Sequence, residues 1–181
     1  LNPKKKIILY GAQNIEAKYK GFNYFLDSLD NLDKSKFIII FFGHLWNENE
    51  IKKKKIEYIK LGFVNDPNFQ RKIYSISDIF VASSLQEGFP KTVAESLLCK
   101  TPVVYFKNTS IEDICESKIV GGYGAKYCDS KDLANGINWL SDQKNNAKDL
   151  AEKASVKILK SFNSEILIKN YITLYDKITK I

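Results

Sequence analysis

The sequence predicts an α/β domain, a doubly wound, Rossmann-like parallel sheet with a helical C-terminal tail. Short apolar runs alternate with longer amphipathic segments along the 181 residues, which is the pattern of repeated β-α units. The composition, 44% hydrophobic and 27% charged, is that of an ordinary globular protein. No apolar run approaches the roughly 20 residues that span a bilayer, so no membrane-spanning helix is expected in it.

Five apolar runs are expected to form the strands of the sheet. Residues 37–42 are apolar throughout and are closed by Gly43, so they are the clearest buried strand. Residues 55–61, which lead into Gly62, alternate more and are expected nearer an edge of the sheet. The other expected strands are residues 6–10, 78–82 and 102–106.

The segments between and after these strands are expected to be helical. Helices are expected over residues 22–32, 68–76, 91–98, 112–117 and 132–140, with a glycine-rich turn at Gly121 and Gly122. Residues 147–181 are expected to form a helical tail, interrupted near residues 161–164, where Ser or Asn can cap the next helix. No linker or repeat divides the chain, so residues 1–163 are expected to be one domain and residues 164–181 a terminal helix.

Charge and cysteine content limit the partners. The three cysteines, Cys99, Cys115 and Cys128, are widely spaced, and we expect buried thiols in a reducing cytoplasm rather than a metal site or disulfide framework. The net charge of +7 favours anionic partners. The densest basic run, Lys52 to Lys55, is interpreted as a solvated loop, with contact to a membrane or polyanion as the alternative.

The loops that follow strands matter most, because ligands of open parallel sheets sit beyond the carboxyl ends of the strands. These loops are residues 11–20, 62–66 and 83–90. The last of them leads into a helix with Pro90 near its first turn, where a missing N–H costs nothing. The backbone N–H groups of Lys91 and Thr92 are expected to be free at the helix start and, with the Lys91 side chain, to form a seat for a phosphate.

Two glutamates lie at the ends of this segment. Glu95 is about five residues into the helix, roughly 7–8 Å along its axis from Pro90 at ~1.5 Å per residue. A carboxylate there can accept hydrogen bonds from two vicinal hydroxyls of a ribose, and Glu87 would reach the other end of the same ligand. On spacing alone, the alternative is that Glu87 is a solvated loop residue and Glu95 an exposed helical one.

The stretch from Asp78 to Leu140 resembles the retaining GT-B glycosyltransferases of family GT4, in particular their C-terminal, donor-binding domain. The motif Ser84-Leu-Gln-Glu87-Gly-Phe is followed by Glu95 and then by Ser96-Leu-Leu-Cys-Lys-Thr-Pro-Val-Val104. Further elements that match in order are Gly62-Phe-Val64, Tyr74-Ser-x-x-Asp78, Ile111-Glu-Asp-Ile114 and Asp132-Leu-Ala-Asn-Gly-Ile137. This ordered set is much more specific than two glutamates eight residues apart.

The resemblance assigns roles by position. It implies that Lys20 neutralises the donor diphosphate, that Glu87 lies near the transferred sugar and that Glu95 binds ribose hydroxyls. Glu87 and Lys20 are thus the candidate catalytic residues, and Lys18 is a weaker diphosphate ligand because it stands where related sequences often have Arg. The expected donor-binding set is Lys18, Lys20, Phe63, Val64, Glu87, Gly88, Phe89, Pro90, Lys91, Thr92 and Glu95.

Some positions depart from the family pattern. Many members have Gly where Pro90 stands, so one phosphate-binding N–H is missing, and Lys91 is expected to offset that loss. Gly11-Ala12 replaces a frequent Gly-Arg, so no arginine is supplied after the first strand. Leu1-Asn2-Pro3 lacks an initiator Met, and nothing matches the family's N-terminal domain, so we expect a piece of a longer protein that binds donor but transfers poorly by itself.

The implied reaction is transfer of a sugar from a nucleoside diphosphate sugar to a glycan or lipid-linked glycan, with retention. The acceptor would bind through the missing domain, and no metal or other cofactor is expected, since no metal-binding cluster is visible. The only histidine, His44, is interpreted as structural rather than as a base. By resemblance, the setting is bacterial polysaccharide assembly in the cytoplasm, with peripheral contact to the inner face of the cell membrane as an option.

Two alternatives stay open from the sequence. One is another nucleotide-dependent Rossmann-like enzyme, although neither Gly-x-Gly-x-x-Gly nor a Walker lysine follows the first strand. The other is a basic nucleic-acid-binding module, although its lysines scatter and no binding motif is evident, so no nucleic acid is expected as a partner.

Overall fold

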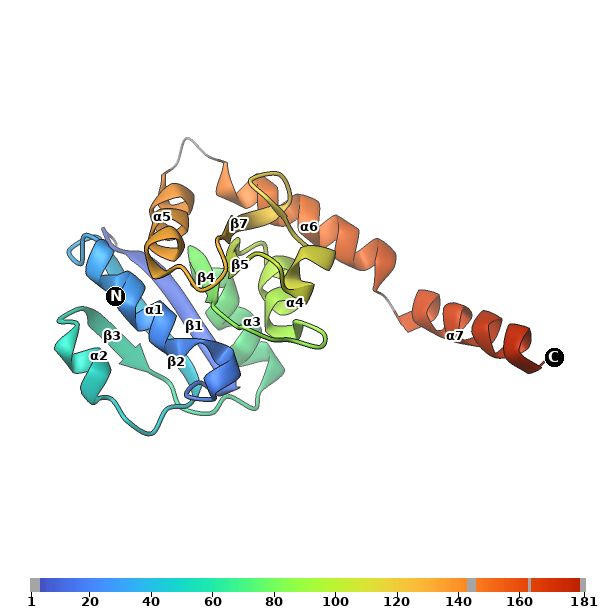
Figure 1. The fold of residues 1–181 in the computed structure, drawn as a ribbon, viewed down its shortest axis with the longest axis horizontal. Helices are drawn as coiled ribbons and strands as arrows, with labels where there is room; N and C mark the ends of the chain where they lie inside the picture. Colours follow the sequence, from blue (N-terminus) through green and yellow to red (C-terminus); the bar gives the residue numbers. More distant parts are fainter. Residues whose placement is uncertain (1–3, 143–145, 163, 180–181) are drawn as a thin grey trace.

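A parallel sheet with helices on both faces forms the body of the molecule (Figure 1). The computed structural model describes residues 4–142, 146–162 and 164–179. Within these residues the strand order is β3-β2-β1-β4-β5-β7-β6, and neighbouring strands run parallel. The strands are β1 (Lys6–Asn14), β2 (Phe37–His44), β3 (Glu57–Lys60), β4 (Ile79–Ala82), β5 (Val103–Phe106), β6 (Glu116–Ser117) and β7 (Gly121–Ala125).

The helices divide between the two faces of the sheet. Helices α1 and α5 pack together over one face, and α4 packs against both α3 and α6 over the other (Figure 1). The described helices are α1 (Phe22–Ser28), α2 (Asn49–Lys53), α3 (Pro67–Ile76), α4 (Lys91–Leu98), α5 (Ser130–Ser141), α6 (Ala147–Ser161) and α7 (Ser164–Thr179), with short 3-10 turns η1 (Lys18–Lys20), η2 (Leu29–Asn31) and η3 (Ser110–Asp113).

The strands feed two separate hydrophobic cores because successive side chains point to opposite faces. In β1, Ile8 and Tyr10 lie in the core beneath α1 and α5, whereas Leu9 lies in the core beneath α3, α4 and α6. The same alternation places Val104 in the first core and Val103 in the second. Strands buried on both faces read as continuous apolar runs, which is why the sequence marks them clearly.

The predicted fold class is confirmed, and each of the five expected strands forms. Residues 55–61 contain β3, which lies at an edge of the sheet as expected. The three cysteines form no disulfide; Cys115 is buried, whereas Cys99 and Cys128 are half-buried. None of the helices in the described ranges is long and apolar enough to cross a membrane.

Three local expectations were wrong. Gly121 and Gly122 do not form a turn but begin β7, which pairs with β5 inside the sheet. Residues 112–117 are not one helix; the 3-10 turn η3 ends at Asp113, and β6 follows. The run Lys52 to Lys55 is not wholly a loop, because Lys52 and Lys53 form the last turn of α2, a helix that the sequence analysis missed.

Helix α4 buries a polar side chain along with its apolar ones. Val93, Ala94 and Leu97 are buried, whereas Leu98 is exposed and Ser96 is buried in its place. Ser96 is tolerated there because its hydroxyl donates to the carbonyl of Thr101, 2.9 Å away.

Helix α7 extends away from the body of the molecule (Figure 1). None of its described residues is buried, and its exposed side chains include Ile168, Tyr171, Ile172 and Tyr175. The division between residues 1–163 and 164–181 stays a prediction, and Asn163 in the expected interruption, like residues 1–3 at the chain start, lies outside the described residues.

The first prediction concerns the glycine that lets β7 approach β5. Gly122 has a φ of 153°, and a Cβ there would lie 2.0 Å from the carbonyl oxygen of Val103. Gly122→Ala is expected to lower the free energy of unfolding by about 2–3 kcal/mol through strain and steric overlap. Urea unfolding followed by circular dichroism measures it, with Gly88→Ala as the control, because a Cβ at Gly88 meets nothing within 4 Å. Equal stabilities of the two variants would contradict the argument that the approach of β7 to β5 requires glycine at position 122.

Candidate functional site

The loops after β1 and β4 meet at the carboxyl edge of the sheet. β1 has β2 on one side and β4 on the other, which is the switch point where open sheets of this kind bind ligands. The backbone N–H of Leu85 donates to the carbonyl of Tyr19, 2.7 Å away. At Gly21, whose φ is 62°, a Cβ would lie 2.0 Å from the carbonyl oxygen of Ser83. Glycine is therefore required for the two loops to come this close.

This contact brings the two candidate catalytic residues together. Lys20 Nζ lies 2.5 Å from Glu87 Oε1, and the hydroxyl of Ser84 donates to the same oxygen over 2.7 Å. The two charged side chains are only 16% and 15% exposed. A pair this shielded from water interacts more strongly than a surface ion pair.

A buried hydroxyl pair lies beneath the ion pair and was missed by sequence reasoning. The hydroxyls of Tyr10 and Ser83 lie 3.0 Å apart, and both reach the carbonyl of Lys20. Burial raises the pKa of Tyr10; the hydrogen bond with Ser83 opposes this effect and the charge of Glu87 adds to it. Together the hydroxyls fix the backbone at Lys20 and Gly21. The only signal in the sequence was a tyrosine at the end of an apolar run.

A pocket of about 370 Å³ opens at the same edge of the sheet, and neither Lys20 nor Glu87 is among its lining residues. One wall is the start of α4, and another comes from the ends of β1 and β2 and the segment after β3. Five predicted donor-binding residues line it, namely Phe63, Val64, Lys91, Thr92 and Glu95. The lining residues that the sequence analysis missed are Ala12, Gln13, Phe42, Gly43 and Gln70.

Glu95 is held in this pocket by helix α3. Its Oε2 accepts from Gln70 Nε2 over 3.1 Å and from the hydroxyl of Tyr74 over 3.2 Å, while Lys91 Nζ lies 3.7 Å from Oε1. Burial raises the pKa of Tyr74, and the charge and hydrogen bond of Glu95 raise it further. Gln70 and Tyr74 thus orient the carboxylate through Oε2, while Oε1 lies on the side of Lys91.

Other predicted residues lie outside this pocket. Lys18 is exposed and lines a different hollow with Phe22 and Asn23. Phe89 is exposed, and its ring packs on Phe162, with the ring centroids 5.5 Å apart. Gly88 is exposed, and Pro90 is buried as the residue that caps α4.

One element of the expected phosphate seat was wrong. The backbone N–H of Lys91 is not free, because it donates to the carbonyl of Phe89, 2.8 Å away. The turn that places Pro90 before the helix folds the chain back on itself and uses this donor. The Lys91 side chain and the helix dipole remain available to an anion.

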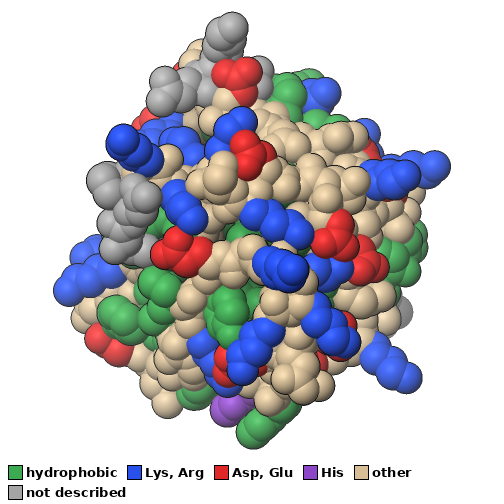
Figure 2. Space-filling view, turned by 90° about the vertical axis from the view of Figure 1, so that its left-hand side faces the viewer, with side chains coloured by type: hydrophobic (Ala, Val, Ile, Leu, Met, Phe, Trp, Pro, Cys, Tyr) green, Lys and Arg blue, Asp and Glu red, His purple; other side chains and the backbone are tan. Residues whose placement is uncertain are grey.

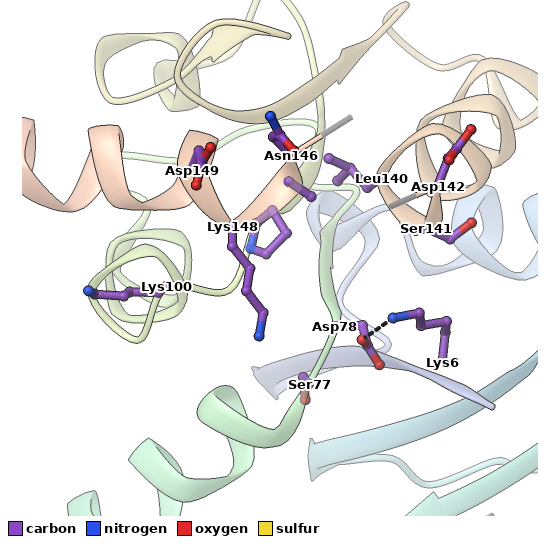
Figure 3. A pocket seen from close by; sticks show the side chains of 12 residues that line it. Lys6, Ser77, Asp78, Lys100, Leu140, Ser141, Asp142, Asn146, Lys148 and Asp149 are labelled. Carbon is purple, nitrogen blue, oxygen red and sulfur yellow. Dashed lines mark hydrogen bonds and ion pairs between the residues drawn. The ribbon is translucent and has the colours of Figure 1, made fainter. Parts of the chain in front are cut away.

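A second hollow, of about 360 Å³, lies at the opposite edge of the sheet (Figure 3). Its lining includes Lys6, Asp78 and Pro102, which lie at or just before the amino ends of strands, and Lys6 is paired there with Asp78. This hollow is nearly as large as the pocket of Glu95 but lies at the opposite edge of the sheet from the loops that carry the candidate residues. Pocket size alone therefore does not identify the functional site. Across the described ranges, no three His, Cys, Asp or Glu side chains gather where they could hold a metal ion.

A doubly wound parallel sheet with a polar pocket at its switch point defines the Rossmann-like class of ligand-binding domains. The sequence matches the family model described as Glycosyl transferases group 1 over residues 1–157. The chain therefore belongs to this family of glycosyltransferases, and the resemblance seen in its motifs is confirmed.

Individual relatives agree with this assignment. The chain is 30% identical to the N,N'-diacetylbacillosaminyl-diphospho-undecaprenol alpha-1,3-N-acetylgalactosaminyltransferase of Campylobacter jejuni, over 98% of this chain and 46% of the relative. The fold is similar to that of sucrose-phosphate synthase from Thermosynechococcus elongatus, with a TM-score of 0.84, 18% identity, and coverage of 99% of this chain and 47% of that one.

A third similar protein was solved with ligands. Anabaena HepE in complex with UDP and glucose matches with a TM-score of 0.77 and 18% identity, over 98% of this chain and 49% of that one. The chain thus spans about half the length of these relatives.

The second prediction follows from the buried hydroxyl beside Glu95. Because the folded-state pKa of Tyr74 is raised above about 10, the value in an unfolded chain, the neutral buried phenol stabilises the fold below pH 10, and this contribution is lost as the pH rises above it. Tyr74→Phe is expected to cost about 1 kcal/mol at pH 7 and to reduce the alkaline loss of stability by up to about 1.4 kcal/mol per pH unit.

Urea unfolding at pH 7, 10 and 11 measures this slope. Tyr175→Phe is the control, because that ring lies on the exposed surface of α7 and its removal should leave the slope as in the wild type. An unchanged slope in Tyr74→Phe would contradict the burial argument.

Proposed function

We propose that this chain is the donor-binding part of a retaining glycosyltransferase that moves a sugar from a nucleoside diphosphate sugar to a glycan or lipid-linked glycan. The observation that carries the proposal is the pocket that Glu95 shares with the start of α4, together with the shielded Lys20–Glu87 pair that the loops after β1 and β4 form at the same edge of the sheet. Family membership and the UDP and glucose bound to the similar HepE support a nucleotide sugar as the donor.

The pocket offers each part of such a donor a chemically suitable partner. The diphosphate would lie at the start of α4 near Lys91 and Thr92, where the helix dipole favours an anion. The ribose diol would bind Glu95, which Gln70 and Tyr74 already orient. The base would lie at the wall formed by Phe63 and Val64, and the transferred sugar near Glu87.

Lys20 would supply the main electrostatic help to the reaction. Cleavage of the glycosidic bond to the donor phosphate builds negative charge on the leaving diphosphate, and a fixed cation in a shielded site stabilises that charge. Glu87 and the Tyr10–Ser83 pair hold Lys20 in place before the donor arrives. We propose that Lys20, Lys91 and the helix start neutralise the diphosphate without a metal ion or other cofactor.

The acceptor is proposed to bind outside this chain, in a further domain like the other half of the relatives. The Campylobacter relative's name places a sugar on a diphospho-undecaprenol carrier, which supports a lipid-linked acceptor for this family member as well. We expect the isolated chain to bind donor and to transfer sugar poorly.

A cytoplasmic enzyme that touches the inner face of the cell membrane fits such an acceptor. The basic run at Lys52 to Lys55 supplies only weak support, because Lys53 pairs with Glu50 and Lys54 with Asp27 and Asp30. We propose peripheral membrane contact for the whole enzyme and no nucleic-acid partner.

The ligand that stabilises the protein distinguishes this proposal from the two alternatives that the sequence left open. Stabilisation by UDP- or GDP-sugars in a thermal-shift screen supports the transferase. Stabilisation by NAD or ATP alone would support another Rossmann-like enzyme, and stabilisation by oligonucleotides alone a nucleic-acid-binding module. Family membership favours the transferase over both.

The third prediction tests the diphosphate contact. Lys20→Ala is expected to weaken the affinity for the best nucleoside diphosphate by about 1–3 kcal/mol, the usual loss for a charged hydrogen bond. Lys91→Ala should weaken that affinity by a smaller amount, since the Lys91 side chain is largely exposed to water. Isothermal titration calorimetry measures both, with Lys177→Ala on the distant α7 as the charge-matched control. The diphosphate site is supported if Lys177→Ala binds as tightly as the wild type and the other two variants bind more weakly. The site is refuted if Lys20→Ala binds as tightly as the wild type.

The fourth prediction tests the ribose contact. Wild-type protein is expected to bind a ribonucleoside diphosphate about 10-fold or more tightly than its 2′,3′-dideoxy form, because a carboxylate contact to hydroxyls is worth about 1.5–3 kcal/mol. Glu95→Gln should bind the two forms with nearly equal affinity. A Glu95→Gln variant that still discriminates between them as the wild type does would place the ribose elsewhere.

A further inference from the structure

One tryptophan is held open to water at the carboxyl edge of the sheet. Trp46, in the segment after β2, is 76% exposed. Its ring stacks on that of His44, with the ring centroids 5.3 Å apart and an interplanar angle of 4°, so the indole presents its opposite face to water. Figure 2 shows His44, the only histidine in the sequence, on the molecular surface beside hydrophobic side chains.

The backbone that carries this tryptophan is anchored. The carboxylate of Glu16 accepts hydrogen bonds from the backbone N–H groups of Trp46 and Asn47, over 2.8 and 3.1 Å. The carbonyl of His44 accepts from Ile15 N over 3.0 Å. The indole is therefore fixed in position before any ligand arrives. A single exposed ring is ordinary on a protein surface, so its significance depends on what lies beside it.

A hollow of about 310 Å³ adjoins this tryptophan. Two of its lining residues are direct neighbours of Trp46, namely Asn47, the next residue in the chain, and Glu16, whose carboxylate binds the Trp46 N–H. The hollow shares no lining residue with the pocket of Glu95 and is therefore a separate feature of the same edge. Its other lining residues include Lys18, Phe22, Asn23 and Glu50.

The polar groups of this hollow suit hydroxyls better than phosphates. The side chains of Lys18 and Asn23 make no hydrogen bond or ion pair with another described residue, so both can donate to a ligand. Glu16 and Glu50 add two carboxylates, of which Glu50 is paired with Lys53. Because the lining carboxylates outnumber the one lining ammonium group, the hollow does not attract phosphates or nucleic acid.

A pyranose sugar has the chemistry that both features require. The C–H groups on one face of the sugar ring pack on the electron-rich face of an aromatic ring, here the indole of Trp46. The hydroxyls around the edge of the sugar exchange hydrogen bonds with amide, ammonium and carboxylate groups. A planar aromatic ligand could use the indole but would leave the polar lining unpaired.

The hollow and the proposed donor pocket are neighbours. Phe63, which lines the pocket of Glu95, also stacks on His44, with the ring centroids 5.0 Å apart. Trp46 stacks on the same histidine, so a row of three rings connects the pocket to the tryptophan beside the hollow. A sugar on Trp46 is thus held at the same edge of the sheet as the proposed donor.

We propose that Trp46 and the hollow lined by Lys18 and Asn23 form a glycan-binding site for a sugar of the acceptor. The inference rests on the proposed function, because it takes the bound glycan to be the acceptor of that reaction. The further domain would still hold the reacting hydroxyl, and this site would hold a sugar farther along the same glycan. Lys18, assigned to the diphosphate by resemblance, thereby serves the glycan instead.

The two tryptophans of the sequence, Trp46 and Trp139, make the test specific. The indole N–H signals of ¹⁵N-labelled protein are recorded by NMR during titration with trisaccharides of glucose, galactose or N-acetylglucosamine, and in parallel with UDP, GDP and a single-stranded oligonucleotide. At least one trisaccharide is expected to shift the Trp46 signal in a saturable manner. The Trp139 signal should stay in place, because that ring lies on α5 against Tyr123.

Variants test both parts of the site, with affinities taken from the backbone N–H signal of Asn47. Trp46→Ala is expected to weaken the best trisaccharide by about 3- to 10-fold, the equivalent of one aromatic contact, whereas Trp46→Phe keeps a flat ring and most of the affinity. Asn23→Ala should weaken it by about 2- to 10-fold, the equivalent of one hydrogen bond, and bind UDP or GDP as the wild type does, since Asn23 does not line the pocket of Glu95. Tyr175→Ala, which removes another exposed ring, is the control.

The outcomes separate this inference from the proposed function. The glycan site is refuted if no trisaccharide shifts the Trp46 signal, if only the oligonucleotide does, or if Trp46→Ala and Asn23→Ala bind the trisaccharide as the wild type does. If UDP or GDP still binds in that case, the proposed function stands alone. If a trisaccharide binds at Trp46 but neither nucleotide binds, the sugar site stands, while the proposed function and the acceptor role fail. Circular dichroism of each variant shows that it is folded.

Discussion

The close approach of the loop after β1 to the loop after β4 is the contact on which the rest of the site depends. It is possible because Gly21 adopts a left-handed backbone conformation and has no Cβ to meet the carbonyl of Ser83. With that contact in place, the hydroxyl of Ser83 can bond the carbonyls of Lys20 and Gly21, and Lys20 reaches Glu87 across the junction. Two segments more than 60 residues apart thereby form one shielded charged pair.

Much of this arrangement could be predicted from the sequence because it follows from parallel strands. Buried parallel strands are continuous apolar runs, so the sheet was visible, and loops after neighbouring strands must share one edge. The strand β7 was missed for a physical reason: Gly121 and Gly122 look like turn residues, yet Gly122 serves to let β7 approach the carbonyl of Val103. Glycine marks close packing as well as turns, and local sequence does not separate the two.

Contacts between side chains of different elements were the part that the sequence did not reveal. Glu95 could be placed on a helix by its spacing, but its partners Gln70 and Tyr74 lie on α3, and only the packing of α3 against α4 brings them together. The surroundings of His44 could not be predicted for the same reason. Its ring stacks on Trp46, which is nearby in the chain, and on Phe63, which the pairing of β2 with β3 brings beside it.

The two parts of the proposed donor site, the Lys20–Glu87 pair and the pocket of Glu95, differ in how ready they are for a donor. Lys20 already has a carboxylate partner, so a diphosphate arriving there exchanges one anion for another and gains less than it would from a free cation. The carboxylate of Glu95, by contrast, is already oriented by Gln70 and Tyr74, so a ribose contact there costs little ordering entropy. Under the proposed function, the ribose contact at Glu95 therefore needs no rearrangement of the site, whereas the diphosphate must displace Glu87 from Lys20 before it can bind that cation.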